Sequence, residues 1–298
     1  MLERSPRVSI VIRTKDRATL LRRALDDIIA QTLTDWEAFV VNDGGASKPV
    51  DDLVAEREGA LQGRLEVIHV DGGTGSMEAA ANLGAQRARG EFVIIHDDDD
   101  TWDPEFLATM TAALDADPEA VAVAARTEII FERLEGDHTT EIRRVPFVPP
   151  AEMVTMYDLL QANRVVPIAL LVRRSVYDEI GWYDPELKAV GDWEFNLRLV
   201  RHGRVPYVGE KPLAFWHQRP HAKGAASNSV FGESLDHMQF DRLVRERALQ
   251  EYVDQNGVGA LLYLSKYIEE TVRYHSFQHA LVRVIRRALA KLPFRRRA

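Results

Sequence analysis

The stretch Ile94-Ile95-His96-Asp97-Asp98-Asp99-Asp100 decides the fold of this chain, because it marks where a central strand ends. Its apolar half has the composition of a buried strand, and four carboxylates follow directly. In an open α/β sheet, the carboxyl ends of the strands form the edge that binds ligands. Adjacent carboxylates repel one another unless positive charge arrives, and a divalent cation is one source. A solvated acidic turn before a helix beginning at Pro104 explains the same residues, so this stretch alone leaves both interpretations open.

Strand-like and helix-like segments alternate on the amino-terminal side of this stretch. Short runs rich in β-branched and aromatic residues predict strands at 8–12, 38–41, 65–70 and 91–96. Segments with helical periodicity separate them, at 21–29, 51–58 and 79–88. This alternation predicts an α/β fold with a Rossmann-like, mainly parallel sheet and helices on both faces.

The pattern changes after the acidic stretch. We expect a helix at 104–116, strands at 121–124 and 127–131, a loop or hairpin at 133–150 and a helix at 153–162. An apolar run at 165–172 suits a buried strand, although Pro167 makes its start uncertain. A helix opening at Gly191 and a last short strand at 213–217 complete this region.

Polar side chains follow three of the predicted strands. Thr14 and Asp16 come after the first, Asp43 after the second, and Asp97 with Asp99 after the fourth. Because the carboxyl ends of parallel strands meet at one edge, these residues are expected to converge. Turns favour Asp and Gly in any case, so each residue alone is explained by local structure. Together they predict a binding site.

Two later residues are further candidates. Asp192 stands where a helix N-cap belongs, and the same place would aim its carboxylate into the cleft. His217 ends the last predicted strand, as a metal ligand or as a histidine of the rim. There is no Gly-x-Gly-x-x-Gly after the first strand and no Gly-Lys-Ser/Thr, so a dinucleotide oxidoreductase and a P-loop enzyme lose support.

The composition bounds the partners and the compartment. The formal net charge of −8 argues against nucleic-acid binding, and the absence of cysteine fits a reducing, cytoplasmic environment. The segment 271–298 holds eight Lys and Arg and no acid, so residues 1–270 carry −16. No apolar run approaches 18 residues, and the first residues lack the apolar core of a signal peptide, so neither a span nor a leader is expected.

Five segments, in this order, resemble the motifs of family-2 glycosyltransferases over roughly residues 6–220. The opening run Val8-Ser9-Ile10-Val11-Ile12-Arg13-Thr14-Lys15-Asp16-Arg17 resembles their first strand and Thr-x-Asn-Arg turn, and Val41-Asn42-Asp43-Gly44-Gly45 resembles their Val-Asp-Asp-Gly-Ser. The others are Asn82-Leu83-Gly84 with Ala88-Arg89-Gly90-Glu91-Phe92-Val93, the acidic run as their Asp-x-Asp motif, and Gly191-Asp192-Trp193-Glu194-Phe195-Asn196-Leu197-Arg198-Leu199 as their Glu-Asp segment.

The resemblance implies the GT-A fold, a Mn²⁺ or Mg²⁺ ion and inversion at the anomeric carbon. It implies that Thr14 and Asp43 contact the nucleobase, that Asp97 lies near the ribose and that Asp99 binds the metal. It implies Asp192 as the general base. The other residues it implies are Asp16, Arg17, Asn82 and Asp98 for the nucleotide, His217 as a further metal ligand, and Trp193 and Glu194 on the acceptor side.

Three positions depart from the family pattern. Ala81 stands before Asn82, where relatives often have Arg, so a phosphate or base contact is expected to be missing. Asn42 replaces the first acid of the second motif, and Gly191 replaces the Glu of the Glu-Asp pair. None of the three removes the predicted metal ligand or the predicted base.

The expected domains are a GT-A domain at 1–220 and an extension at 221–298. The first divides into a nucleotide-sugar-binding half, 1–103, and an acceptor-binding half, 104–220. The segment 221–228 is polar and small, and fits a mobile loop over the donor or a plain linker. Helices are expected at 233–255, 258–274 and 277–292. The last is basic and amphipathic, which fits peripheral contact with an anionic membrane or packing on the domain or in a homodimer.

The resemblance thus implies an inverting, metal-dependent glycosyltransferase. It would move a sugar from a UDP- or dTDP-sugar to a hydroxyl of a glycan or lipid-linked acceptor, at the inner face of the membrane, in assembly of a bacterial surface polysaccharide such as O-antigen or capsule. Two alternatives stay open. A nucleotidyltransferase would want a basic triphosphate loop near the first strand, and a non-catalytic nucleotide-sugar-binding protein would not need Asp99 and Asp192.

Overall fold

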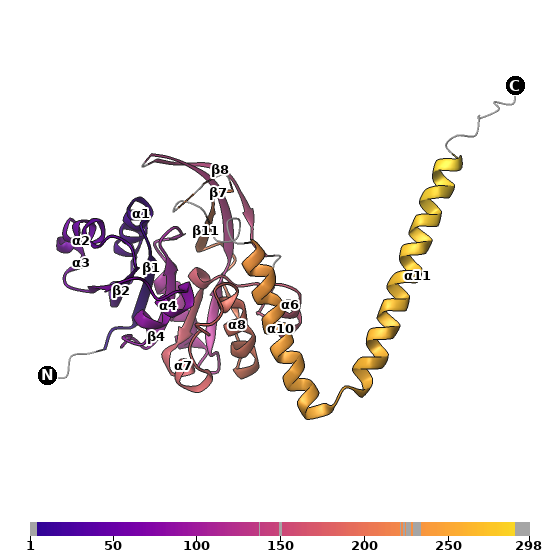
Figure 1. Cartoon of the computed structure of the whole chain (residues 1–298). Helices are drawn as coiled ribbons and strands as arrows, with labels where there is room; N and C mark the ends of the chain where they lie inside the picture. Colours follow the sequence, from indigo (N-terminus) through magenta and orange to yellow (C-terminus); the bar gives the residue numbers. More distant parts are fainter. Residues whose placement is uncertain are drawn as a thin grey trace, which may run out of the picture. The chain divides into compact units, whose positions relative to one another are not determined.

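The structure is a computed structural model of the chain (Figure 1). It describes residues 5–136, 138–148, 151–220, 222, 224, 228 and 234–289, with side chains as far as Tyr274. The chain divides into two compact units, Met1–Arg242 and Leu243–Ala298.

Four parallel strands form the centre of the first unit. They are β1 (Val8–Thr14), β2 (Trp36–Asp43), β3 (Leu65–Val70) and β4 (Phe92–Asp97), in the order β3-β2-β1-β4. The apolar residues of β1, β2 and β4 are buried, as expected for parallel strands covered on both faces. The register sets Arg13 beside Val41 and Asp97, so β1, β2 and β4 end at one level. The predicted α/β fold with a mainly parallel sheet is confirmed.

Three shorter strands extend this sheet beyond β4. They are β9 (Leu170–Arg173), β6 (Ala122–Ala125) and β10 (Tyr207–Val208), in the order β4-β9-β6-β10. The strand predicted at 165–172 begins only at Leu170, because Pro167 opens a 3₁₀ turn, Pro167–Ala169. Proline has no backbone N–H to give to a neighbouring strand, so it suits the turn better than the sheet. Because β9 runs antiparallel to both neighbours, this edge is mixed.

A second sheet has four strands, in the order β5-β11-β7-β8. They are β5 (Thr101–Trp102), β11 (Ala214–Gln218), β7 (Thr127–Glu135) and β8 (His138–Pro146). The hairpin of β7 and β8 is one of the two alternatives expected for 133–150. The acidic run joins the two sheets, since Asp97 ends β4 and Thr101 begins β5.

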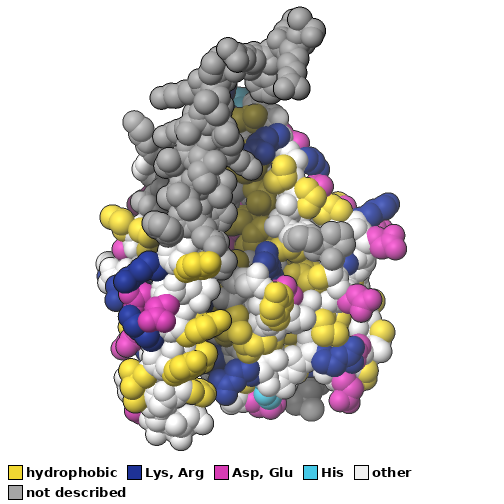
Figure 2. Space-filling view, turned by 90° about the vertical axis from the view of Figure 1, so that its right-hand side faces the viewer, with side chains coloured by type: hydrophobic (Ala, Val, Ile, Leu, Met, Phe, Trp, Pro, Cys, Tyr) yellow, Lys and Arg dark blue, Asp and Glu magenta, His cyan; other side chains and the backbone are white. Residues whose placement is uncertain are grey.

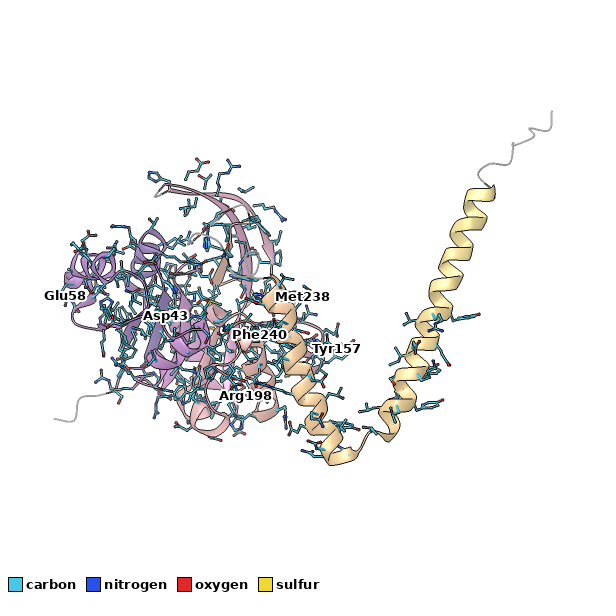
Figure 3. All side chains as sticks on the ribbon, viewed as in Figure 1. Asp43, Glu58, Tyr157, Arg198, Met238 and Phe240 are labelled. Carbon is cyan, nitrogen blue, oxygen red and sulfur yellow. The ribbon has the colours of Figure 1, made fainter. Side chains whose placement is uncertain are left out.

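Eight helices lie in the part of the first unit that ends at His202. They are α1 (Ala18–Ile29), α2 (Ser47–Ala55), α3 (Glu58–Leu61), α4 (Met77–Ala85), α5 (Phe106–Ala116), α6 (Met156–Gln161), α7 (Arg174–Ile180) and α8 (Gly191–His202). Helix α4 packs closely on β1 at Gly84, where an added Cβ would lie 2.4 Å from a methyl carbon of Val11. Arg198 of α8 holds the loop after α7, because its guanidinium donates to the carbonyl oxygen of Trp182 at 2.8 Å (Figure 3).

Two long helices follow. Helix α10 (Ser234–Asn256) crosses the boundary between the units, and α11 (Gly259–Leu289) is one continuous helix where the sequence predicted two. The predicted break near 275 contains neither Gly nor Pro, so nothing stops the helix there. Large apolar side chains, among them those of Tyr263, Tyr267 and Ile268, are exposed on α11. Hydrophobic and charged side chains both lie on the face that Figure 2 shows.

Among the described helices, none has the length and apolar character needed to cross a membrane. The basic face expected over 277–292 falls on side chains outside the described residues, as do most residues of the predicted loop 221–228.

Candidate active site

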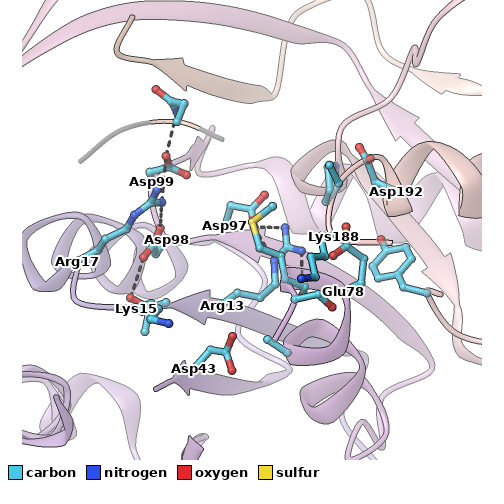
Figure 4. Close-up of a pocket in the computed structure, with 18 of the residues that line it drawn as sticks. Arg13, Lys15, Arg17, Asp43, Glu78, Asp97, Asp98, Asp99, Lys188 and Asp192 are labelled. Atoms are coloured by element: carbon cyan, nitrogen blue, oxygen red, sulfur yellow. Dashed lines mark hydrogen bonds and ion pairs between the residues drawn. The ribbon is translucent and has the colours of Figure 1, made fainter. Parts of the chain in front are cut away.

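A cavity of about 740 Å³ opens where the carboxyl ends of β1, β2 and β4 face the amino ends of α4 and α8 (Figure 4). Parallel strands that end at one level explain why residues far apart in sequence meet there. Seven of the predicted site residues line it: Thr14, Arg17, Asp43, Asp97, Asp98, Asp99 and Asp192.

The turns after β1 and β2 form one end of the cavity. Asp16 has a left-handed φ of +52°, and its Oδ1 accepts from the backbone N–H of Ala46 at 3.0 Å, so it joins the two turns. The Asp43 Oδ1 accepts from the backbone N–H of Thr74. Gly44 allows this approach, because an added Cβ would lie 2.9 Å from the backbone nitrogen of Gly73. Asp43 therefore faces the cavity, whereas Asp16 holds the turn.

Arginines bind three carboxylates of the acidic run. The Arg13 Nε donates to the Asp97 Oδ1 at 2.8 Å, in a pair set by the register of β1 and β4. The Arg17 Nη1 donates to the Asp98 Oδ1 at 2.9 Å and lies 3.5 Å from the Asp99 Oδ2. Thus Arg13 on β1 and Arg17 just after it pair with carboxylates at and after the end of β4.

Asp98 is the most enclosed of these three acids. Its Oδ2 accepts from the Thr14 hydroxyl at 2.7 Å, and its side chain is buried. Burial and the neighbouring Asp99 raise the pKa of Asp98 to about 6, against the opposing effect of Arg17. Asp98 therefore serves to hold Thr14 and Arg17 in place.

Arg219, directly after β11, links the acidic run to the second sheet. It is 1% exposed, its guanidinium pairs with Asp99, and its Nη1 donates to the Glu132 Oε1 at 2.6 Å. The Asn228 Nδ2 donates to the Asp99 Oδ2 at 3.1 Å. Burial alone would raise the pKa of Glu132, but hydrogen bonds from His217 and Arg23 hold it well below its ordinary value.

His217 lies in this polar network and not in the cavity lining. Its Nδ1 is 2.7 Å from the Glu132 Oε2, and its Nε2 is 2.9 Å from the Thr101 hydroxyl. Its backbone N–H donates to the Asp100 Oδ1 at 2.8 Å. Burial lowers the pKa of His217, and burial together with Asp99 raises the pKa of Asp100 well above its ordinary value. Both residues therefore fix the junction of the two sheets.

Protein donors already occupy the Asp99 oxygen that a divalent cation would need. In the described parts of the chain, no three His, Asp or Glu side chains converge on a common point. The Asp99 Oδ2 already binds the Arg219 guanidinium, and both ring nitrogens of His217 have partners. A cation on Asp99 would have to displace Arg219 first.

Asp192 faces the cavity from the first turn of α8. The Asn163 Nδ2 donates to its Oδ2 at 2.7 Å, and Asn163 is held by the Asn196 amide at 3.0 Å. Burial raises the pKa of Asp192, against the backbone N–H of Trp193 and the charge of Arg13. A carboxylate oriented in this way and open to the cavity can accept a proton from a bound hydroxyl.

Three further predicted residues do not line the cavity. The Asn82 amide donates to the carbonyl oxygen of Tyr183 at 2.8 Å and accepts from its N–H at 3.1 Å, so it joins α4 to the loop before α8. The Trp193 indole is buried and donates to the carbonyl oxygen of Leu159 at 2.7 Å. Glu194 pairs with Arg198 at 2.7 Å. Contacts of these residues with a ligand stay predictions.

Sequence reasoning did not identify four charged residues of this region: Arg13, Glu78, Glu132 and Arg219. Arg13 belongs to the quoted opening run, and Arg219 lies two residues after His217, so charge within a motif was the available signal for both. Glu78 is the one charged residue of α4, and Glu132 lies among other charged residues of β7, so neither belongs to a recognisable motif. Only pairing with residues more than 80 positions away brings Glu132 into the network.

Comparison with known proteins gives the family. The family model described as "Glycosyl transferase family 2" matches residues 9–181. The "Uncharacterized glycosyltransferase YwdF" of Bacillus subtilis is 32% identical over 68% of this chain and 71% of its own length. The "O-antigen biosynthesis protein RfbC" of Myxococcus xanthus is 26% identical over 92% of this chain, which spans only 20% of that protein.

Solved structures share the fold. S. aureus TarS 1-349 in complex with UDP-GlcNAc aligns with a TM-score of 0.59 at 18% identity, over 85% of this chain and 75% of that one. GalNAc-T7 with UDP, GalNAc and Mn²⁺ aligns with a TM-score of 0.53 at 17% identity, over 73% of this chain and 45% of that one. These neighbours have the GT-A fold.

Proposed function

The chain belongs to glycosyltransferase family 2, and on that premise we propose that it transfers a sugar, with inversion, from a UDP- or dTDP-sugar to an acceptor hydroxyl. One observation carries the proposal. Asp43, the acidic run and the base candidate Asp192 all line one cavity. A nucleotide bound at the β1 and β2 turns would extend its sugar toward Asp192.

The nucleotide would bind across the ends of β1, β2 and β4. Asp43 would accept the N3–H of the pyrimidine, and Asp97 would lie near the ribose. The charge of the diphosphate would be met by the basic side chains that line the cavity: Arg13, Lys15, Arg17 and Lys188. The UDP and UDP-GlcNAc complexes of TarS support a pyrimidine nucleotide in a related fold.

Asp192 would act as the general base. The acceptor hydroxyl attacks the anomeric carbon from the face opposite the diphosphate, and its proton passes to the Asp192 carboxylate. The bond between the anomeric carbon and the diphosphate oxygen breaks, and its electron pair leaves with the diphosphate. Asn163 would hold the carboxylate in the orientation for this transfer. General-base assistance of this kind contributes roughly 10²–10⁴ in rate.

Mn²⁺ or Mg²⁺ on Asp99 is a separate part of the proposal, supported by the Mn²⁺ in the GalNAc-T7 complex. When bound, such a cation would supply Lewis-acid stabilisation of the leaving diphosphate. Calorimetry of UDP and dTDP binding with and without Mn²⁺ tests it, in the wild type and in Asp99→Asn. We expect the metal-dependent part of the affinity to disappear in the variant. Equal metal dependence in both proteins would exclude Asp99 as the ligand.

We place the reaction in assembly of a bacterial surface polysaccharide, on a glycan or lipid-linked acceptor. Similarity to the O-antigen biosynthesis protein RfbC supports this placement.

The activity is tested with a panel of UDP- and dTDP-sugars, incubated with the protein and Mn²⁺ in the absence of acceptor. Slow release of UDP or dTDP from one member of the panel is the expected result. Binding of a nucleotide sugar without release, with or without glycan acceptors, would favour a non-catalytic binding protein. Pyrophosphate release from UTP or dTTP and a sugar 1-phosphate would favour a nucleotidyltransferase.

A further inference from the structure

Glu78 is a buried carboxylate that the mechanism above does not use. It is the second residue of α4, it is 4% exposed, and it lines the cavity. Its Oε2 is buried and has no hydrogen-bond partner in the described part of the chain. Burial raises the pKa of Glu78 to about 7, although Arg13 acts against this. An unpaired buried carboxylate oxygen is unfavourable, so its persistence at a cavity wall suggests a missing partner.

Gly191 provides the space for this carboxylate. A Cβ added at Gly191 would lie 2.3 Å from the Cγ and 2.7 Å from the Oε1 of Glu78. Any side chain at 191 would therefore force the Glu78 side chain out of its present position. The departure seen in the sequence, Gly in place of Glu before Asp192, thus has a spatial counterpart. Helix α4 supplies the carboxylate that α8 lacks.

The place of Glu78 in the cavity indicates its ligand. On one side lies Arg13, which holds Asp97 and acts electrostatically on Glu78. On the other side lies Asp192, whose charge also acts on Glu78 (Figure 4). In a transfer reaction, the group between the nucleotide and the attacking hydroxyl is the transferred sugar. A sugar presents hydroxyl donors, which are the partners that an unpaired carboxylate oxygen accepts.

We infer that Glu78 binds a hydroxyl of the transferred sugar, in a pocket that exists because residue 191 is glycine. This inference rests on the proposed function and adds a specificity-determining residue to it. The competing explanation is that Glu78 only stabilises the amino end of α4, where a carboxylate is favourable. That explanation predicts a change in stability without a change in sugar recognition.

Titration calorimetry separates the two explanations. The probes are UDP, dTDP and the member of the UDP- and dTDP-sugar panel that the wild type binds most tightly. At pH 8, where Glu78 is ionised, we expect Glu78→Gln to bind the free nucleotide as the wild type does. We expect it to bind the nucleotide sugar roughly tenfold more weakly, since a hydrogen bond to a charged acceptor is lost. Glu58→Gln is the matched control, because Glu58 is a first-turn carboxylate of α3, away from the cavity (Figure 3).

A second test moves the carboxylate from position 78 to position 191. Glu78→Ala should lose the preference for nucleotide sugar over nucleotide. Gly191→Glu alone should lose it too, because the new side chain meets Glu78. The double variant Glu78→Ala/Gly191→Glu removes that collision and returns a carboxylate to the same space, so its preference should recover relative to Glu78→Ala.

The outcomes distinguish this inference from the proposed function. If the wild type prefers a nucleotide sugar and Glu78→Gln keeps that preference in full, the inference is wrong and the proposed function stands. A double variant that melts like the wild type but shows no recovery would also contradict the inference. If the wild type releases no UDP or dTDP from any member of the panel, the proposed function itself fails, and this assignment fails with it.

Discussion

At the scale of single residues, the cavity sorts chemically identical carboxylates by their surroundings. Asp97 and Asp99 pair with arginines, Asp98 holds Thr14, and Asp100 accepts from a backbone N–H. Asp192 accepts from the Asn163 amide and the backbone N–H of Trp193, and it borders the open cavity. Because the carboxylates of Asp97, Asp98 and Asp99 are held in ion pairs with arginines, Asp192 is better placed than they are to take a proton from a bound hydroxyl.

The role of Asp192 predicts the behaviour of Asp192→Asn. Turnover should fall roughly 10²–10⁴-fold because the amide cannot accept the proton, while the dissociation constant of the nucleotide sugar stays nearly unchanged. Release of UDP or dTDP and calorimetry measure the two quantities. Asp52→Asn, an exposed residue of α2, is the control. Near-normal turnover of Asp192→Asn would exclude Asp192 as the base. Since burial raises the pKa of Asp192, wild-type activity should rise with pH as this carboxyl ionises.

The buried Glu78 predicts a pH-dependent stability. Its pKa is raised from 4.5 to about 7 in the folded protein, so the folded state binds the proton more tightly than the unfolded state does. Stability is therefore lost as pH rises from 4.5 to 7, by on the order of 3 kcal/mol at most. Glu78→Gln removes this loss, so its melting temperature relative to the wild type should be higher at pH 8 than at pH 5. An equal difference at both values would contradict the raised pKa.

The sequence predicted the residues that follow strands and missed those that act across the fold. Thr14, Asp43 and the acidic run could be placed because parallel strands deliver their carboxyl ends to one edge. Glu78 could not be placed, because its side chain occupies space left by Gly191, which lies 113 positions later in the chain. Nor does the sequence indicate that Arg219 would take the Asp99 oxygen predicted for a metal. Such pairings depend on tertiary packing that no local pattern records.

At the scale of elements, the central parallel strands were predictable, whereas the pairing of the later strands into a second sheet was not. The first four strands can be recognised in the sequence as apolar runs that alternate with helical segments. In the second sheet, β11 pairs with β7 and β5, which lie about 80 and 110 residues earlier in the chain, and β5 has two residues. The acidic run therefore has a role beyond ligand binding, since it is the covalent link that sets one sheet against the other.

Helix α4 positions Glu78 through its packing on β1, which predicts the effect of Gly84→Ala. The new methyl group would lie 2.4 Å from a Val11 methyl carbon, so overpacking should destabilise the fold by about 1–3 kcal/mol. Gly59→Ala is the matched control, because α3 leaves open space there and alanine favours helix. Urea unfolding of both variants measures the difference. Equal stability of the two variants would contradict the close packing of α4 on β1 at Gly84.

At the scale of the whole molecule, a basic segment without acidic residues lies beyond the described side chains. On α11, Lys266 lies 3.4 Å from Glu269 and 3.9 Å from Glu270, and Arg273 pairs with Glu269 as well. This part of the helix is therefore close to neutral. The seven basic residues after Tyr274 have no acidic residue among them. Attraction to an anionic surface, where present, must come from this last segment.

The basic segment predicts that binding to vesicles depends on charge. We expect the full chain to float with phosphatidylcholine vesicles that contain phosphatidylserine, less so at high salt, and not with phosphatidylcholine alone. The variant Arg283→Gln/Arg286→Gln/Arg287→Gln keeps the chain length and should bind more weakly by about 1 kcal/mol for each charge removed. A chain ending at Tyr274 should not float. Equal flotation of all three proteins would exclude membrane attachment by this segment, and its apolar positions would then be explained by packing within a protein interface.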